Sequence, residues 1–270
     1  MALPRFFLEE QVLPAEQEAV FPLRLAADDA RHARVLRLAP GEHIAVVDAA
    51  SDYFECEVAS MDGDVPLVRI AQRGGAQPLR PTVMLVQGLA KGDKMDEVVR
   101  HGTELGVAAF LPLACERSVV RLEPKKAMAR AERWRAIAKS AAMQSGQPSI
   151  PKVSAPASLA EACAALGGAT AVLVCWEEAP ATASLREALE RGLAACCCPA
   201  ADARVAVVVG PEGGLTEAEA QALLACNPRA ALVTLGPSIL RTETAGVVAP
   251  ALALYELGAL GSPWRWGMRP

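Results

Sequence analysis

Histidine and aromatic residues are scarce in this chain of 270 residues. Only three histidines occur, His32, His43 and His101, and aromatic residues make up 4% of the sequence. The eight cysteines include no C-x-x-C pair, and those at 196–198 are consecutive, which is poor spacing for ligands that share one ion. We therefore expect free thiols and no metal site.

Long apolar runs and an excess of positive charge are also missing. No stretch of eighteen apolar residues is free of charges and turn breakers, so no membrane span is expected. The opening residues, MALPRFFLEEQ, lack the basic and apolar segments of a signal peptide. Free thiols fit a reducing compartment, so we expect a cytoplasmic protein. A formal charge of −4 and 52% hydrophobic residues are compatible with one or two domains with a substantial core.

The most informative stretch runs from Val205 to Leu257. It contains two apolar runs, Val205–Val209 and Ala231–Leu235, which end in the turns GPEGG (210–214) and GPS (236–238). A β-branched run that ends at glycine is typical of a buried parallel strand leading into a ligand-binding loop, and we expect the two strands to be neighbours. Glycine also lets a ligand approach the bare backbone. The dinucleotide motif G-x-G-x-x-G is absent, and no Gly-Lys-Ser/Thr follows the glycines as in a P-loop.

A helix is expected after each turn. Thr216, with Glu219 three residues later, predicts a capping box. The second turn leads through Ile239 and Leu240 into the polar quartet Arg241–Thr244, at the head of an apolar helix over residues 245–257. An ordinary turn and an ordinary helix start explain either motif alone, but the pair indicates a site.

The remainder divides into two parts. Residues 1–74 predict a small β-rich domain, with strands at 44–48, 53–58 and 65–70 and a helix at 28–38. Residues 73–78 are the expected linker. Beyond it, strands and helices alternate, which predicts a parallel sheet with helices on both faces. The expected strands are 82–89, 107–113 and 172–175, and the expected helices are 94–105, 125–144, 158–166 and 184–191.

A basic segment interrupts this acidic chain between residues 117 and 152. Nine cations face two anions there, Glu123 and Glu132, so the segment carries 9 − 2 = +7. The cations are Arg117, Arg121, Lys125, Lys126, Arg130, Arg133, Arg135, Lys139 and Lys152. Such a segment is typical of polyanion binding, although a solvated amphipathic helix is the simpler alternative. If the polyanion is a nucleic acid, phosphate contacts of this kind orient it without selecting its sequence.

The two C-terminal motifs, GPEGGLTEAE and LGPSILRTETA, resemble the motif pair of the RsmE family in the SPOUT superfamily of methyltransferases. Further segments resemble the same family, so the likeness covers nearly the whole chain. They are Arg5-Phe6-Phe7, the VLR segment within 32–41, the KGDKMD block at 91–96, ELGV at 104–107 and ERS at 116–118.

The resemblance implies a fold and an activity. The fold is a PUA-like β-barrel associated with RNA binding over residues 1–74, then a SPOUT domain over 75–270 whose C-terminal chain forms a trefoil knot. The cofactor is S-adenosylmethionine, and the substrate is N3 of a uridine in 16S rRNA of the small ribosomal subunit. A homodimer is also implied, with the helix over residues 245–257 either at the interface between subunits or buried within one subunit.

The resemblance also places site residues. Cofactor contacts are expected from Gly210, Glu212, Gly213, Gly214, Leu235, Gly236, Ile239, Leu240, Arg241, Thr242, Glu243 and Thr244. Arg241 is the first candidate to stabilise negative charge on the uracil, with Glu243 or Glu212 as an orienting or proton-accepting partner. RNA contacts are expected from Arg5, Arg31, Arg34, Arg37, Arg117 and Arg121. Arg31, Arg34 and Arg37 share one helix face, for which simple solvation is the ordinary explanation.

Three positions depart from the family pattern. Ser238 stands where the family often has arginine, and Met143 and Gln147 replace the charged positions of an E-Q-x-x-R segment. Two alternatives therefore stay open: a SPOUT methyltransferase for a different RNA nucleotide, and a non-catalytic RNA-binding paralogue.

Overall fold

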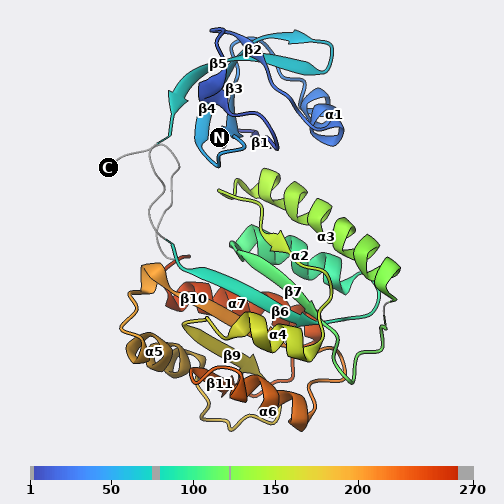
Figure 1. The fold of residues 1–270 in the computed structure, drawn as a ribbon, viewed down its shortest axis with the longest axis vertical. Coiled ribbons are helices and arrows are strands. Elements are labelled where there is room, and N and C mark those ends of the chain that lie inside the picture. Colours follow the sequence, from blue (N-terminus) through green and yellow to red (C-terminus); the bar gives the residue numbers. More distant parts are fainter. Residues whose placement is uncertain (1–2, 75–79, 122, 261–270) are drawn as a thin grey trace. The chain divides into compact units, whose positions relative to one another are not determined.

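A computed structural model of the protein (Figure 1) describes residues 3–74, 80–121 and 123–260. Contacts divide them into two compact units. One unit contains residues 3–74 and Ala142–Ser149, and the other contains residues 80–121, 123–141 and 150–260. Most of the linker expected at 73–78 lies outside the described residues.

The first unit is built on a five-stranded sheet in the order β1-β3-β4-β5-β2. Its elements are β1 (Arg5–Phe7), β2 (Phe21–Pro22), α1 (Ala27–Leu36), β3 (His43–Val47), β4 (Tyr53–Asp62) and β5 (Val65–Arg73). The pair β1–β3 is parallel and the other pairs are antiparallel. In β4 the buried residues Phe54, Cys56 and Val58 alternate with partly exposed ones, because successive side chains of a strand point to opposite faces.

The second unit is built on a six-stranded parallel sheet in the order β11-β9-β10-β6-β7-β8. Its strands are β6 (Thr82–Gly88), β7 (Ala109–Leu113), β8 (Lys152–Val153), β9 (Ala171–Cys175), β10 (Arg204–Val209) and β11 (Ala230–Val233). Its helices are α2 (Lys94–Leu105), α3 (Pro124–Ser145, of which residues 142–145 belong to the first unit), α4 (Leu159–Leu166), α5 (Leu185–Ala195), α6 (Glu217–Ala225) and α7 (Thr242–Glu256). The predicted parallel α/β sheet is confirmed.

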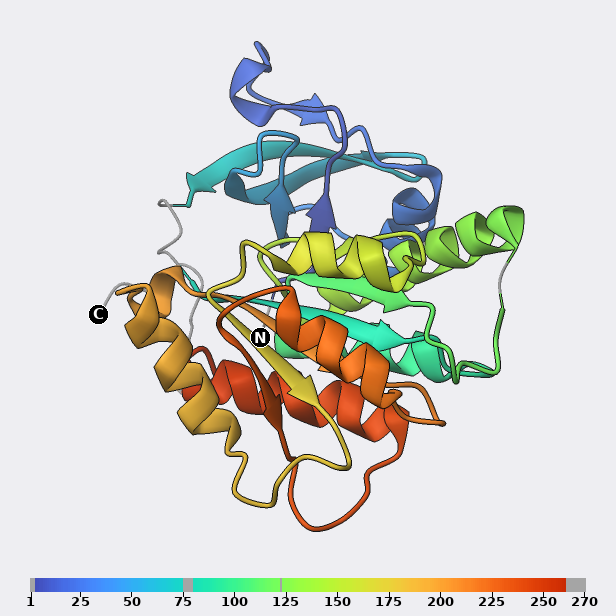
Figure 2. The same cartoon turned by 60° about the horizontal axis from the view of Figure 1, so that its bottom comes forward.

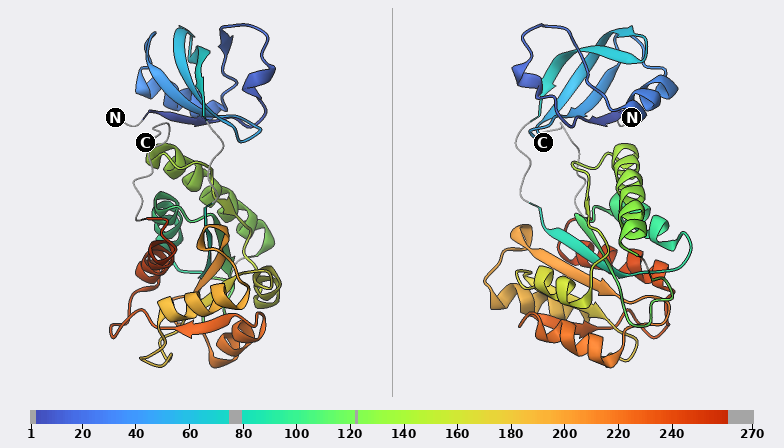
Figure 3. Two further views of the ribbon diagram at one scale, coloured as in Figure 1. Left: turned by 90° about the vertical axis from the view of Figure 1, so that its left-hand side faces the viewer. Right: turned by 45° about the vertical axis from the view of Figure 1, so that its right-hand side comes forward.

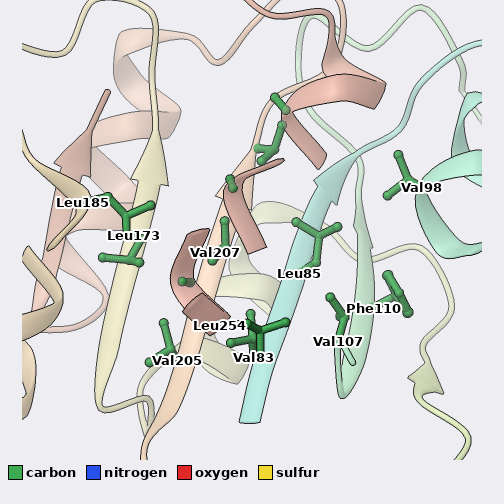
Figure 4. Close-up of a cluster of buried hydrophobic side chains, with 14 of the residues drawn as sticks. Val83, Leu85, Val98, Val107, Phe110, Leu173, Leu185, Val205, Val207 and Leu254 are labelled. Atoms are coloured by element: carbon green, nitrogen blue, oxygen red, sulfur yellow. The ribbon is translucent and has the colours of Figure 1, made fainter. Parts of the chain in front are cut away.

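Helices cover both faces of this sheet, as Figure 2 and Figure 3 show. Val205, Val207 and Val209 of β10 pack with residues of α2, α5 and α7, whereas Ala206 and Val208 pack with α4 and α6. Figure 4 shows the first cluster, in which Val207 and Leu173 lie on neighbouring strands and Leu254 of α7 lies beside Val83 of β6. Because both faces are buried, the strands read as continuous apolar runs.

The order of the strands corrects one expectation. We expected the strands before the two glycine turns to be neighbours, but β9 lies between β10 and β11 and pairs with both. A parallel connection returns the chain through a helix on one face of the sheet, so it can pass over a strand as easily as join the adjacent one. The apolar runs predict where strands occur, and they carry no information on their order.

Local predictions hold closely elsewhere in the described chain. Helix α2 has the expected bounds, and Thr216 and Glu219 form the expected capping box at the start of α6. Helix α7 begins at Thr242 with Arg241 as its N-cap, so the polar quartet forms the first turn itself. None of the helices in the described ranges combines the length and the apolar character needed to cross a bilayer.

Replacing Leu173 with alanine should strongly destabilise the second unit. Leu173 is fully buried in β9 and lies opposite Val207 of β10 and Ala231 of β11. The cavity left behind should lower the free energy of unfolding by about 2–5 kcal/mol, measured by urea denaturation. Met128→Ala on α3 is the matched control, because half-exposed Met128 should change stability by only about 0.5 kcal/mol. Equal midpoints for the two variants would contradict the assignment of Leu173 to the core.

Candidate functional site

A cavity of 750 Å³ opens at the carboxyl ends of β9, β10 and β11. It is lined by the residues that follow these strands, together with Lys91 and Lys94 beyond β6. Ligands of open parallel sheets bind at this edge, because the loops leaving the strands diverge there. The whole cavity lies within the second unit.

The loop after β10 is the GPEGG turn at 210–214. Gly214 has a φ of +70°, in the left-handed region that favours glycine, and a side chain there would collide with the carboxylate of Glu177. The turn leads into α6 through the capping box, in which the Thr216 amide donates to Glu219 at 2.8 Å. The other oxygen of the buried Glu219 carboxylate accepts from the Glu116 amide at 2.8 Å. The α6 N-terminus is thereby joined to the turn after β7.

The loop after β11 supplies the opposite wall. Gly236 has a φ of +113°, and no atom lies within 4 Å of the position that a side chain would take. Leu235 and Leu240 are partly buried against the core, whereas Ile239 is 88% exposed. The loop thus presents bare backbone at Gly236 and an apolar side chain at Ile239.

A buried hydrogen-bond chain fixes α7 against the GPEGG loop. The Thr242 hydroxyl donates to the Gly210 carbonyl at 2.6 Å, and the Gln87 amide nitrogen donates to the Thr242 oxygen at 2.8 Å. Gln87 is only 1% exposed and lies at the end of β6, opposite Val209. Sequence reasoning missed Gln87, although a single amide inside an apolar strand is itself unusual.

A charged cluster lies at the rim of the cavity. The Lys94 ammonium is 3.1 Å from a Glu212 oxygen and 3.0 Å from a Glu243 oxygen. The Lys91 amide also donates to Glu212 at 3.1 Å. The hydrogen bonds to Glu243 and Glu212 raise the pKa of Lys94. Burial acts to raise the pKa of each carboxyl, but amide donors and Lys94 outweigh it, so the pKa values of Glu212 and Glu243 lie below their usual range.

The end of β9 contributes residues that the sequence reasoning overlooked. Cys175, Trp176 and Glu177 line the cavity, and the Trp176 indole donates to the Leu215 carbonyl at 3.3 Å. A sequence signal existed, because the apolar run Val172–Cys175 passes abruptly into Trp-Glu-Glu. Without the strand order, nothing placed that segment between the two glycine turns.

Most of the predicted cofactor residues line this single cavity. They are Gly210, Glu212, Gly213, Gly214, Leu235, Gly236, Ile239, Leu240, Arg241 and Thr242. Glu243 meets the cavity through Lys94, and Thr244 is exposed and lies outside the lining. Arg241 is exposed at the N-cap of α7, so its guanidinium is available to a ligand at the cavity mouth.

The predicted RNA-contact residues fall into separate groups. Arg117 donates to the carbonyls of Gly213 and Leu215 at 3.3 and 3.4 Å, and so touches the GPEGG loop. Arg121 is exposed and donates to the Glu116 carbonyl at 3.4 Å.

The remaining four lie in the first unit. Arg31, Arg34 and Arg37 are exposed on α1 and at its C-cap, where Arg31 pairs with Asp28 and Arg34 with Asp64. Arg5 is 5% exposed in β1, with its guanidinium 5.5 Å from the centre of the Tyr53 ring. Burial lowers the pKa of Arg5.

Metal ligands do not gather at the cavity. Within the described part of the chain, no cluster of three or more histidine, cysteine, aspartate or glutamate side chains is arranged to hold an ion. The polar groups along the cavity include backbone amides and carbonyls, one arginine, two lysines, carboxylates and the hydroxyls of Thr234, Ser238 and Thr242. This set suits an organic ligand bound by hydrogen bonds and charge.

Comparisons with known proteins agree with this geometry. A family model described as an RNA methyltransferase domain matches residues 77–254. Ribosomal RNA small subunit methyltransferase E of Bacillus subtilis is 33% identical over 264 residues, covering 94% of this chain and 97% of that protein. The protein of the same name from Mycobacterium bovis is 33% identical over 242 residues, covering 88% of this chain and 86% of the relative.

Solved structures are similar along the same length. The crystal structure of ribosomal RNA small subunit methyltransferase E from Neisseria gonorrhoeae, bound to S-adenosyl methionine, has a TM-score of 0.74 at 28% identity. The alignment covers 94% of this chain and 97% of that one. Both the sequence matches and this structure span the two glycine loops and the sheet that carries them. The chain therefore belongs to the ribosomal RNA small subunit methyltransferase E (RsmE) family of RNA methyltransferases.

Proposed function

We propose that this chain transfers the methyl group of S-adenosylmethionine to N3 of a uridine in 16S rRNA of the small ribosomal subunit. The observation that carries the proposal is the cavity between the two glycine loops, in a chain whose relative from Neisseria gonorrhoeae is bound to S-adenosyl methionine. The name shared by the sequence relatives, ribosomal RNA small subunit methyltransferase E, supports the substrate class.

The residues present fit such a cofactor. The cavity volume of 750 Å³ lies within the range of small-molecule sites. Gly236 leaves open space beside its backbone, and the apolar side chains of Leu235, Ile239 and Leu240 offer surface for a flat aromatic base. The bound cofactor supplies an electrophilic methyl group on a sulfonium. The protein then has to hold that group against the nitrogen in line for transfer.

Arg241 is the residue proposed to act on the base. The N3 proton of uracil must leave before or during transfer, and negative charge develops on the ring. A guanidinium at the cavity mouth stabilises that charge. Glu243 and Glu212 are assigned the orienting role, because backbone amide donors and Lys94 lower their pKa values and a carboxylate of lowered pKa is a weaker base. The target base has to be unstacked to reach the site.

Several structural features belong to the same proposal. The domain division is 1–74, a PUA-like β-barrel, and 75–270, a SPOUT domain. The five-stranded sheet supports the first assignment, and the parallel sheet supports the second. A trefoil knot is proposed for the C-terminal chain, supported by α7, whose first turn is tied to the loops that follow β6 and β10.

The proposal also includes a homodimer and a set of residues that contact RNA. A homodimer is proposed through α7, whose Leu252 and Tyr255 are exposed apolar residues. Positive residues are proposed to contact the rRNA backbone, and phosphate contacts supply orientation rather than base choice. These residues are Arg31, Arg34, Arg37, Arg117 and Arg121. Arg5, which was also expected to contact RNA, is 5% exposed and donates to the carbonyls of Gly146 and Gln147, so it is left out of this set.

A different RNA nucleotide is the second candidate substrate. It is favoured by the departures at Ser238, Met143 and Gln147, which remove two arginines and one glutamate of the family pattern. Of the three, Ser238 lines the cavity. Met143 is a buried side chain, so it has joined the packing instead. A non-catalytic RNA-binding role is the third reading.

The proposal is tested by incubating the protein with labelled S-adenosylmethionine and small subunits that lack the modification. Mass analysis of the nucleosides should find the label in N3-methyluridine. Label in another nucleoside would show that the chain is a methyltransferase for a different RNA nucleotide. Cofactor binding without any transfer to subunits or to naked rRNA would favour the non-catalytic role.

Replacing Arg241 with alanine should lower kcat by about 100- to 1000-fold, because it removes the cation proposed to stabilise the charged base. Single-turnover transfer measures this step, and cofactor titration separates it from binding. Arg186→Ala is the control, since Arg186 lies on α5 and pairs with Glu256 at 2.9 Å. Unchanged transfer by the Arg241 variant would assign charge stabilisation to another group.

A further inference from the structure

Lys94 joins two segments that come from distant parts of the chain. Glu212 belongs to the loop after β10, and Glu243 belongs to the first turn of α7. Lys94 is the first residue of α2, and its ammonium lies 3.1 Å from a Glu212 oxygen and 3.0 Å from a Glu243 oxygen. The Lys91 amide adds a hydrogen bond of 3.1 Å to Glu212, so the β6–α2 connection meets the same loop twice.

We infer that Lys94 is a positioning residue that sets the spacing between the GPEGG loop and α7, and with it the shape of the cofactor pocket. The inference rests on the proposed function, because it gives the pocket its occupant. Lys94 lines the cavity, but its ammonium is bound to the protein's own carboxylates. It therefore affects a ligand by holding the GPEGG loop and α7 in place.

The charges explain why a cation is needed at this place. Glu212 and Glu243 lie on either side of one ammonium, so without it two carboxylates would face each other across the same gap. Like charges at short range repel, and one of them would have to protonate or move away. The N-terminus of α7 favours the charge on Glu243 through the helix dipole, but it does nothing for Glu212.

Partial burial gives this interaction weight. The side chains of Lys94, Glu212 and Glu243 are 24%, 21% and 18% exposed. Fully exposed ion pairs contribute little, whereas charges at a cavity rim are less screened by solvent. Three charges in one cluster also hold their geometry better than an isolated pair.

A second, neutral connection between the same segments makes the inference testable. The Thr242 hydroxyl, buried beside Gln87, binds the Gly210 carbonyl independently of Lys94. Loss of Lys94 should therefore leave α7 docked and the chain folded, while the rim of the pocket opens. A change in ligand affinity without unfolding separates positioning from general stability.

The test compares Lys94→Met with wild type, using S-adenosylhomocysteine as the probe in calorimetric titration. Lys94→Met keeps the aliphatic stem and removes the charge. We expect its affinity at about pH 7 to fall about tenfold, within the range for coupled neighbouring charges. Lys94→Arg should recover most of the loss, because it restores a cation that can bridge both carboxylates.

Arg186→Met is the matched control. It removes an ion pair of similar length between α5 and the last turn of α7, away from the cavity. Its affinity should equal that of wild type, and its melting temperature should change little, because the Arg186 side chain is 61% exposed. Should Lys94→Met fail to fold, Glu212→Gln and Glu243→Gln provide the same comparison, because each removes one side of the cluster.

The dependence of ligand affinity on acid pH separates the proposed role of Lys94 from a purely structural one. The pKa values of Glu212 and Glu243 are lowered in the folded protein. Their ion pairs with Lys94 are therefore fully present above the usual carboxyl pKa, and they are lost as pH falls through the lowered values. Lys94 is the cation that helps to lower both pKa values, and Arg241 adds to the effect on Glu243. Without Lys94 both pKa values rise, so acid pH protonates one carboxyl of the pair and relieves their repulsion. The affinity loss of Lys94→Met should therefore shrink between about pH 7 and about pH 5, where wild type stays level.

Each outcome decides the inference. Weaker binding by Lys94→Met, recovery in Lys94→Arg and the shifted pH profile support it. Wild-type affinity of Lys94→Met at both pH values overturns it, as does a loss that Lys94→Arg and Arg186→Met share equally. Failure of the wild-type protein itself to bind the probe or S-adenosylmethionine would instead contradict the proposed function.

Discussion

The hydrogen bond from the Thr242 hydroxyl to the Gly210 carbonyl is the contact on which the site depends. At 2.6 Å, and supported by the buried Gln87 amide, it joins the start of the last helix to the loop after a central strand. The Thr242 side chain is buried, so separating its hydroxyl from the Gly210 carbonyl is costly, because the hydroxyl would lose its acceptor. The two glycine loops therefore face each other across one cavity, although the chain between Gly214 and Gly236 includes a whole helix and strand.

Around this neutral contact, the charged cluster of Lys94, Glu212 and Glu243 adjusts the rim. The two interactions differ in kind: one is buried and insensitive to pH, and the other is partly exposed and made of titratable groups. Such a division suits a site that must keep its fold and still admit and release a ligand. The parallel sheet beneath supplies the rigid support, with both faces packed against helices.

The sequence predicted local features far better than long-range ones. The longer strands, the α2 bounds and the Thr216–Glu219 capping box depend on neighbouring residues, and they are confirmed, whereas the short strands β1, β2 and β8 were not predicted. The placement of β9 between β10 and β11 was not predicted, because apolar runs carry no information on strand order. For the same reason Gln87, Trp176 and Glu177 were missed: their roles arise only when distant segments meet. Residues predicted from the family resemblance largely line one cavity, since that resemblance already contains three-dimensional information.

The most direct measurement is a crystal structure of the protein with S-adenosylhomocysteine. The account predicts density for the ligand between the loops at 210–214 and 235–241, with the Thr242–Gly210 hydrogen bond retained. Density at another place on the sheet, or a complex in which these loops do not touch the ligand, would contradict it.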